Sequence, residues 1–237
     1  FFWVARMIVA GYEYRDEMPF KNVYFTGIVR DKQRRKMSKS LGNSPDPIEL
    51  MKKYGADGVR AGMLFSAPAG NDLLFDEKLC EQGRNFSNKL WNAFRLIQTL
   101  EVSDKGNDQS LAIDWINSRF NEVLKEVDDH FSKYRISDAL LSLYTFIWDD
   151  FCSWYLEIIK DNSISDKTHK GTLAVLDKIL KTLHPFMPFI TEELWNQIDK
   201  ERDYIMISDY PLPENFDEVL NNDFKKVFEM VTGLRKL

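Results

Sequence analysis

The spacing of apolar residues divides the chain into a short first part and a longer second part. In the first part, residues 1–14 repeat apolar side chains at the helical interval, and residues 22–29 (NVYFTGIV) are rich in β-branched and aromatic residues. The first pattern predicts a helix that ends near Gly11, and the second predicts a buried strand. A helix, a strand and then a polar loop are the order found at the edge of an α/β sheet, where ligands bind beyond the carboxyl ends of the strands.

Residues 46–65 carry the signals of two consecutive short helices. Asp46 suits the N-cap position, Pro47 suits the first turn, and Gly55 suits the end of the first helix. We therefore expect one helix between these residues and a second one directly after Gly55.

From residue 76 onward, apolar positions recur at helical spacing only. The predicted helices cover residues 77–99, 111–131, 136–160 and 166–184, a segment capped by Thr191, and the tail from residue 217. The polar residues 103–110 predict a loop. The predicted fold is mainly α: a helical bundle over residues 76–237, preceded by a small α/β unit over residues 1–75.

The composition is that of an ordinary globular protein. The chain has 237 residues, of which 44% are hydrophobic and 29% are charged, so it can bury a substantial core. No apolar run reaches the roughly 20 residues that span a bilayer, and we expect no membrane partner. Cys80 and Cys152 lie far apart without a CxxC partner, which favours a cytoplasmic setting over a disulfide framework or a zinc site. Because the sequence starts without Met inside an apolar stretch, we expect it to be a segment of a longer protein.

The densest cluster of positive charge lies in residues 32–44 (KQRRKMSKSLGNS), although the net charge of the chain is −5. Lysine ammonium groups and serine hydroxyls are suited to phosphate oxygens, and a lysine can stabilise the charge that develops on a leaving pyrophosphate. Gly42 allows a tight turn behind the loop, and Asn43 tolerates the same backbone angles. On spacing alone, a solvated basic loop is the simpler explanation of the run.

The order of residues within the run resembles a known sequence motif. KMSKS followed by LGN resembles the second nucleotide motif of the class I aminoacyl-tRNA synthetases, in particular the branch for Val, Ile, Leu and Met. The flanking residues 20–60, together with RNFSNKLWNAFR, DDFCSWYLE and LHPFMPFITEELW, are similar to the valyl-tRNA synthetase family and its helical anticodon-binding domain. One departure is Arg34, where relatives commonly have a small residue such as Gly.

The resemblance implies a role for each residue of the motif. Lys39 is expected to contact ATP first and, with Lys36, to act in catalysis, while Ser38 and Ser40 support the triphosphate. Met37 is expected to pack the loop against the adenosine side. The implied reaction is the ATP-dependent activation of valine and its transfer to tRNA(Val), with Mg²⁺ accompanying ATP, in a monomeric cytoplasmic enzyme. No metal site is expected in this chain.

Further candidates concern RNA binding. On the predicted helix 77–99, three cations could touch tRNA phosphates or simply form its solvent face: Arg84, Lys89 and Arg95. Four aromatic residues could stack on unpaired bases, although their helical spacing favours the core: Trp148, Phe151, Trp154 and Tyr155.

The first nucleotide motif of class I synthetases, a His-x-Gly-His sequence, does not occur in these residues. The chain has only His130, His169 and His184, each in a predicted helical segment. We therefore expect these residues alone not to form valyl-adenylate at a meaningful rate. Two alternatives stay open: a non-catalytic tRNA-binding helical module, and the same region of an isoleucyl- or leucyl-tRNA synthetase.

Overall fold

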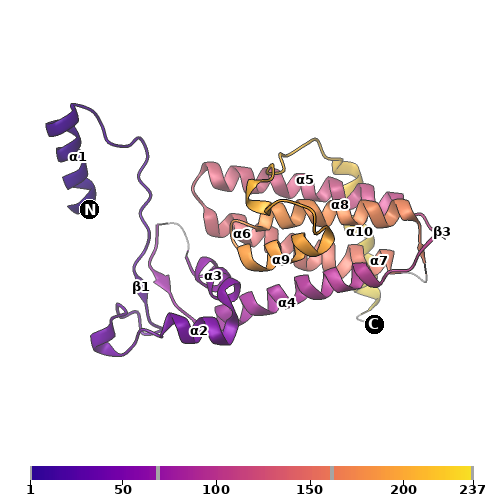
Figure 1. Ribbon diagram of the computed structural model, residues 1–237, viewed down its shortest axis with the longest axis horizontal. Helices are drawn as coiled ribbons and strands as arrows, with labels where there is room; N and C mark the ends of the chain where they lie inside the picture. The colour runs from indigo at the N-terminus through magenta and orange to yellow at the C-terminus, as the bar shows by residue number, and fades with distance from the viewer. Residues whose placement is uncertain (1, 68–69, 161–162, 236–237) are drawn as a thin grey trace.

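A computed structural model describes residues 2–67, 70–160 and 163–235 (Figure 1). The chain is mainly helical, with two strands that pair in parallel near its beginning. The first part contains α1 (Phe2–Arg15), β1 (Val29–Arg30), the 3₁₀ turn η1 (Lys39–Leu41), α2 (Pro47–Tyr54), α3 (Ala56–Phe65) and β2 (Leu73–Leu74). The prediction of a small α/β unit followed by a helical bundle is confirmed in its class.

The second part is the bundle. It contains α4 (Glu77–Thr99), β3 (Val102–Asn107), α5 (Ser110–Ser132), α6 (Ile136–Thr145), η2 (Phe146–Tyr155), α7 (Leu156–Ile159), α8 (Asp166–Leu183), α9 (Pro188–Ile198), η3 (Ile205–Ile207) and α10 (Glu218–Leu234). The helical segment predicted over 136–160 is continuous through α6, η2 and α7. Its middle portion, η2, is a π-helix, in which Ser153 Oγ donates to the carbonyl of Trp148 five residues earlier at 2.8 Å.

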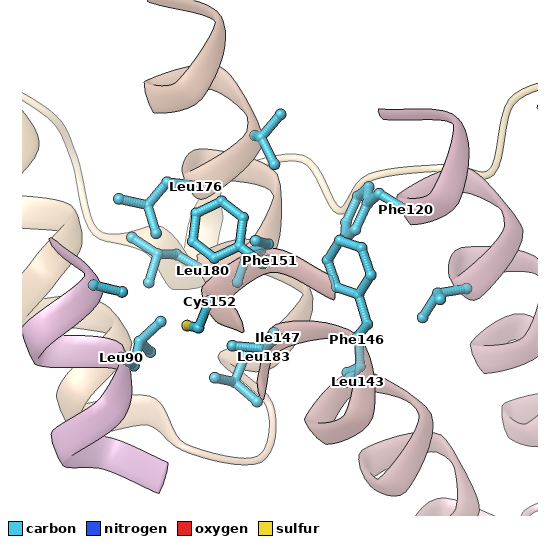
Figure 2. Close-up of a cluster of buried hydrophobic side chains, with 14 of the residues drawn as sticks. Leu90, Phe120, Leu143, Phe146, Ile147, Phe151, Cys152, Leu176, Leu180 and Leu183 are labelled. Atoms are coloured by element: carbon cyan, nitrogen blue, oxygen red, sulfur yellow. The ribbon is translucent and has the colours of Figure 1, made fainter. Parts of the chain in front are cut away.

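The bundle core is made of side chains from helices far apart in the sequence. Figure 2 shows Leu90 of α4, Phe120 of α5, Phe146 and Phe151 of η2, and Leu180 of α8 converging on one apolar region. All five are almost completely excluded from water. Burial of this kind is the main stabilising contribution to the bundle, because each large apolar side chain contributes about 1.5–3 kcal/mol.

The strand predicted over residues 22–29 is wrong in extent. Only Val29 and Arg30 form β1, which pairs with Leu73 and Leu74 of β2, while residues 22–28 run extended and exposed. The physical reason is that a strand needs a neighbour. Among the described residues, the short β2 is the only partner strand that β1 has.

Three other predictions need correction. Helix α1 continues past Gly11 to Arg15 and ends before Asp16, which has a φ of +51°. The expected loop 103–110 is partly the extended segment β3. Just before this segment, the Glu101 carbonyl accepts a hydrogen bond from the Ile164 N–H at 2.9 Å. Thr191 does not cap a helix, because α9 already starts at Pro188 and Thr191 lies in its first turn.

Helix α3 packs against α4 with almost no side chain between the two backbones. A Cβ built on Gly83 of α4 would lie 2.4 Å from the carbonyl oxygen of Gly58 in α3, and one built on Gly62 would lie 2.6 Å from the Cys80 nitrogen. These distances are far below any normal contact. Glycine is therefore required at this crossing by close approach.

We expect Gly83→Ala to lower the free energy of unfolding by about 2 kcal/mol, because overpacking a tight contact costs roughly 1–3 kcal/mol. Urea denaturation of the chain, followed by circular dichroism, measures the change. The matched control is Gly233→Ala near the end of α10, where an added Cβ meets nothing within 4 Å. Equal unfolding midpoints for the two variants would contradict the close approach of α3 and α4.

Candidate functional site

The basic loop begins directly after β1 and is organised by one carboxylate. Asp31 accepts hydrogen bonds from the backbone N–H groups of Gln33 and Arg35, both at 2.9 Å. The same carboxylate accepts from Arg35 Nε at 2.8 Å and from Asn43 Nδ2 at 3.0 Å. The hydrogen bond from Asn43, followed by those from Arg35, lowers the pKa of Asp31 to about 2. Asp31 therefore stays ionised and ties the two ends of the loop together.

Asn43 closes the loop from its other end. Its Oδ1 accepts from the backbone N–H of Ser38 at 2.9 Å, and its Nδ2 also donates to the Lys36 carbonyl at 3.3 Å. The expectation for Gly42 is confirmed, since it ends η1 in the left-handed region with a φ of +64°. Asn43, which tolerates the same backbone angles, does not adopt them. It shapes the loop through its side-chain amide.

The serines of the motif lie between these two anchors. Ser38 caps η1, because its Oγ accepts from the Leu41 N–H at 3.3 Å. The hydroxyl of Ser38 also lies 3.1 Å from the hydroxyl of Ser40. Two adjacent hydroxyls that can rotate are able to turn a hydrogen toward an incoming anion.

The cations of the loop fall into two classes. Three of them are engaged by carboxylates: Arg30 by Asp72, Arg35 by Asp31 at 2.8 Å, and Lys32 by Asp76 at 3.1 Å.

In contrast, Lys36 and Lys39 form no ion pair with any described residue and are exposed to solvent, as is Arg34. The motif lysines are thus available to an external anion, and the donor set of two ammonium groups and two hydroxyls fits a polyphosphate. Within the described part of the chain, no three His, Cys, Asp or Glu residues are grouped in a way that could hold a metal ion.

Arg34 is at the apex of the turn, where its backbone is in the left-handed region with a φ of +64°. Its N–H donates to the Asp31 carbonyl at 2.8 Å, and its own carbonyl accepts from Arg30 Nη1 at 3.1 Å. A non-glycine residue is strained in this region. The structure therefore gives a physical reason for the small residue that the resemblance leads one to expect at this position.

Met37 faces the protein. Its N–H donates to the Val29 carbonyl at 3.1 Å, and its half-buried side chain packs on a small apolar cluster that includes Leu50, Tyr54 and Leu73. The contact anchors the loop on α2 and β2. Its expected packing against adenosine stays a prediction.

The three cations expected to touch tRNA do not form one stripe on α4. At about 100° per residue, Arg84 and Arg95 share a face of the helix, and Lys89 points elsewhere. The Arg84 guanidinium lies 5.6 Å from the ring centre of Tyr54, and Lys89 Nζ lies 5.0 Å from that of Trp148. Arg95 is exposed, with no ion pair to any described residue. It is the most accessible of the three to a phosphate.

The four candidate aromatic residues differ in burial, with two completely buried and two half-buried. Phe151 and Tyr155 are completely buried, as the core interpretation requires. Trp148 and Trp154 are only half-buried, and their rings stack on those of Tyr144 and Phe228, with centroids 5.5 and 4.0 Å apart. Both indoles are therefore already engaged within the protein.

Sequence reasoning missed Asp31 and the side-chain role of Asn43. A signal was present, since an aspartate heads a run of cations and Asn43 follows the turn glycine. An acidic residue beside several cations is a frequent sign of a local ion pair. The pattern could not show that its carboxylate also accepts backbone N–H groups.

Two family models match different parts of the chain. Residues 114–237 match the family model described as the anticodon-binding domain of tRNA ligase. Residues 1–76 match the model described as tRNA synthetases class I (I, L, M and V). Among the described residues, no helix has the length and apolar character needed to cross a membrane.

Curated relatives are similar over the whole chain. It is 56% identical to the valine–tRNA ligases of Christiangramia forsetii and of Phocaeicola vulgatus, and 43% identical to that of Fusobacterium nucleatum. All of this chain is covered in each case, but only 28–29% of the relative. The chain thus spans little more than a quarter of the length of these ligases.

One solved structure has a similar fold. It is the ternary complex of an Agrobacterium radiobacter LeuRS with tRNA and LeuAMS, with a TM-score of 0.67 and 19% sequence identity. The match covers 91% of this chain and 27% of the other. At this identity, the likeness concerns the arrangement of helices alone.

The pKa of Asp31 leads to a test of the loop geometry. Because the folded-state pKa is about 2, below the ordinary 3.8, the stabilisation by Asp31 is complete above pH 3.8 and is lost as the pH falls toward 2. We expect the amide proton resonances of Gln33 and Arg35 to titrate with a midpoint near pH 2. In the control variant Asp31→Asn this titration disappears. A midpoint near 3.8 in the unmodified chain would show that the carboxylate does not hold the loop.

Proposed function

The chain belongs to the anticodon-binding domain family of tRNA ligases, with a class I tRNA synthetase segment ahead of that domain, and on this premise we propose that it serves a valine–tRNA ligase. In that enzyme it supplies the KMSKS loop and the helical bundle that binds tRNA(Val). The observation that supports this most directly is the partition of cations in the loop, which leaves Lys36 and Lys39 without carboxylate partners.

The proposed reaction uses these lysines in its first step. A carboxylate oxygen of valine attacks the α-phosphorus of ATP, the bond to the bridging oxygen breaks, and pyrophosphate leaves while valyl-adenylate forms. Negative charge grows on the leaving pyrophosphate, so an ammonium group placed there stabilises the transition state more than the ground state. Lys39 performs this role, assisted by Lys36, and the hydroxyls of Ser38 and Ser40 bind phosphate oxygens.

The reaction continues away from this chain's loop. The 3′ end of tRNA(Val) takes the valyl group from the adenylate, and AMP is released. We place the boundary between the catalytic segment, residues 1–75, and the anticodon-binding bundle, residues 76–237, at the start of α4. The exposed Arg95 is the strongest of the three α4 candidates for a tRNA phosphate contact, because Arg84 and Lys89 are less exposed and lie over the rings of Tyr54 and Trp148.

The exposed apolar surface of the first segment supports a larger catalytic domain around it. Phe2 and Trp3 are more than 70% exposed, and Tyr24 and Phe25 are also largely exposed. Exposed apolar side chains that gather in one segment of the chain are suited to a contact with further protein. We propose that the remainder of a class I catalytic domain, with the His-x-Gly-His motif, covers it and completes the ATP site.

A substitution at Lys39 tests the proposal in a complete ligase, obtained by placing this chain at the corresponding position of the Christiangramia forsetii enzyme. We expect Lys39→Ala to slow adenylate formation about 100-fold, the cost typical of losing one preorganised charge donor. Single-turnover measurement of valyl-adenylate gives this rate. The Kd for tRNA(Val) should stay unchanged, because the lysine faces ATP.

The matched control is Lys32→Ala, which removes the same charge from the same loop, where it is already paired with Asp76. It should leave adenylate formation nearly unaffected. If Lys39→Ala were as active as the unmodified ligase, the loop would have no catalytic role, and the alternative of a non-catalytic tRNA-binding module would be favoured.

A further inference from the structure

The position of the basic loop depends on two short helices that follow it. Helix α2 starts at Pro47, four residues after Asn43, and only Gly55 separates α2 from α3. The first of these helices is tied to the start of α4, because Glu77 accepts from Lys53 Nζ at 2.7 Å and from the Tyr54 hydroxyl at 2.9 Å. Whatever fixes α3 therefore also fixes the exit of the loop (Figure 1).

Helix α3 carries a buried carboxylate that bonds to a distant helix. Asp57 is 5% exposed, and it accepts from the backbone N–H groups of Phe189 at 3.3 Å and Ile190 at 2.6 Å. These are N–H groups of the first turn of α9, which have no partner within their own helix. The N-cap residue of α9 is Met187, whose side chain makes no capping hydrogen bond. Asp57 thus caps α9 from another helix, more than 130 residues away in the sequence.

One turn further along α3, Arg60 binds the other side of the same connection. Its Nε donates to the Phe186 carbonyl and its Nη2 to the Pro185 carbonyl, both at 3.1 Å. These carbonyls lie between the end of α8 and the start of α9. Asp57 and Arg60 therefore hold the α8–α9 connection by its acceptors and its donors together, and we call this pair the α3 latch.

The latch has a cost of burial that an apolar contact between α3 and α9 would not have. A buried aspartate is costly, and burial raises the pKa of Asp57, while the two N–H donors act in the opposite direction. An apolar residue at this position would avoid the penalty of desolvation, but it would leave the Phe189 and Ile190 N–H groups without an acceptor. The two polar side chains also fix the direction and register of α9 relative to α3, because hydrogen bonds are directional.

We propose that the α3 latch couples tRNA binding on the bundle to the position of the KMSKS loop, with Asp57 and Arg60 as positioning residues. This rests on the function proposed above. In this proposal, tRNA bound along the bundle favours one position of the connection between α8 and α9. Because Asp57 and Arg60 bond to that connection, the same binding favours one position of α3 and, through α2, one position of the exit of the loop. Neither residue touches ATP or the reacting atoms.

The test compares two tRNA substrates in the same ligase with this chain in place. One is full-length tRNA(Val), and the other is an acceptor minihelix that lacks the anticodon arm and cannot reach the bundle. We expect Asp57→Ala to lower kcat/KM for full-length tRNA about tenfold, a coupling of ordinary size. Charging of the minihelix and ATP–pyrophosphate exchange without tRNA should stay at the unmodified rates.

Two further variants separate coupling from folding. Asp57→Asn retains one of the two acceptor oxygens, which can accept from either the Phe189 or the Ile190 N–H but not replace both carboxylate oxygens, so it should restore only part of the preference for full-length tRNA. Arg60→Ala alters an exposed side chain and should lower the preference without unfolding the protein. The control Glu49→Ala removes an exposed carboxylate of α2 whose one ion pair among the described residues is with Lys52, and it should change nothing.

The outcomes distinguish this proposal from the one it rests on. If the unmodified ligase charges tRNA(Val) but Asp57→Ala and Arg60→Ala lower both substrates equally, or neither, the latch does not couple the two sites. If the unmodified ligase charges no tRNA, the proposed function itself fails. Hydrogen exchange gives an independent measure, since loss of the latch should speed exchange at Phe189 and Ile190 while the α4 core stays protected.

Discussion

The close approach of α3 and α4 is the constraint on which the rest of the molecule depends. Glycines at 58, 62 and 83 bring the two backbones nearly into contact, and the side chain nearest to a Cβ built on Gly83 is the small one of Ala61. Helix α4 is in turn embedded in the bundle core through residues such as Phe86 and Leu90. The two short helices behind the basic loop are therefore joined to the bundle at α4, and the loop precedes them in the chain.

Charge distribution in the loop follows a simple physical rule. A carboxylate that accepts hydrogen bonds from backbone N–H groups holds the neighbouring residues in place. Cations that have no carboxylate partner remain available to a ligand. Asp31 and Asp72 fix the base of the loop, while Lys36 and Lys39 extend beyond it. The overall charge of −5 does not oppose phosphate binding, because exposed charges act mainly within about 10 Å at ordinary ionic strength.

Much of the fold could be predicted from the sequence, because apolar residues that recur at a strong helical period predict a helix. Helix α4 begins at Glu77 and ends at Thr99, as the period of its apolar residues predicts, and in the structure Asp76 caps it. The strand at 22–29 was overestimated because β propensity describes a residue's fitness for a sheet, and only a partner strand makes the sheet. The start of α9 carries a signal in Pro188 at its first position, but its capping partner could not be predicted, since Asp57 is distant in sequence.

In the candidate site too, the residue types could be predicted but their hydrogen-bond partners could not. The motif residues could be selected by type and order, and the structure brings Lys36 to Ser40 together on one loop. Their partners could not be selected, since Asp31 and Asn43 act through hydrogen bonds that depend on the folded path of the chain. The α4 cations were grouped by proximity in sequence, but Lys89 is directed to Trp148 and away from the face of Arg95.

The most direct test of the central claim is the charging of tRNA(Val) with valine by the Christiangramia forsetii ligase in which this chain replaces the corresponding region. The claim is that this chain supplies the KMSKS loop and the tRNA-binding bundle of such an enzyme. We predict charging at a rate comparable to that of the parent ligase. A folded hybrid that neither exchanges pyrophosphate with ATP nor charges tRNA(Val) would contradict the account.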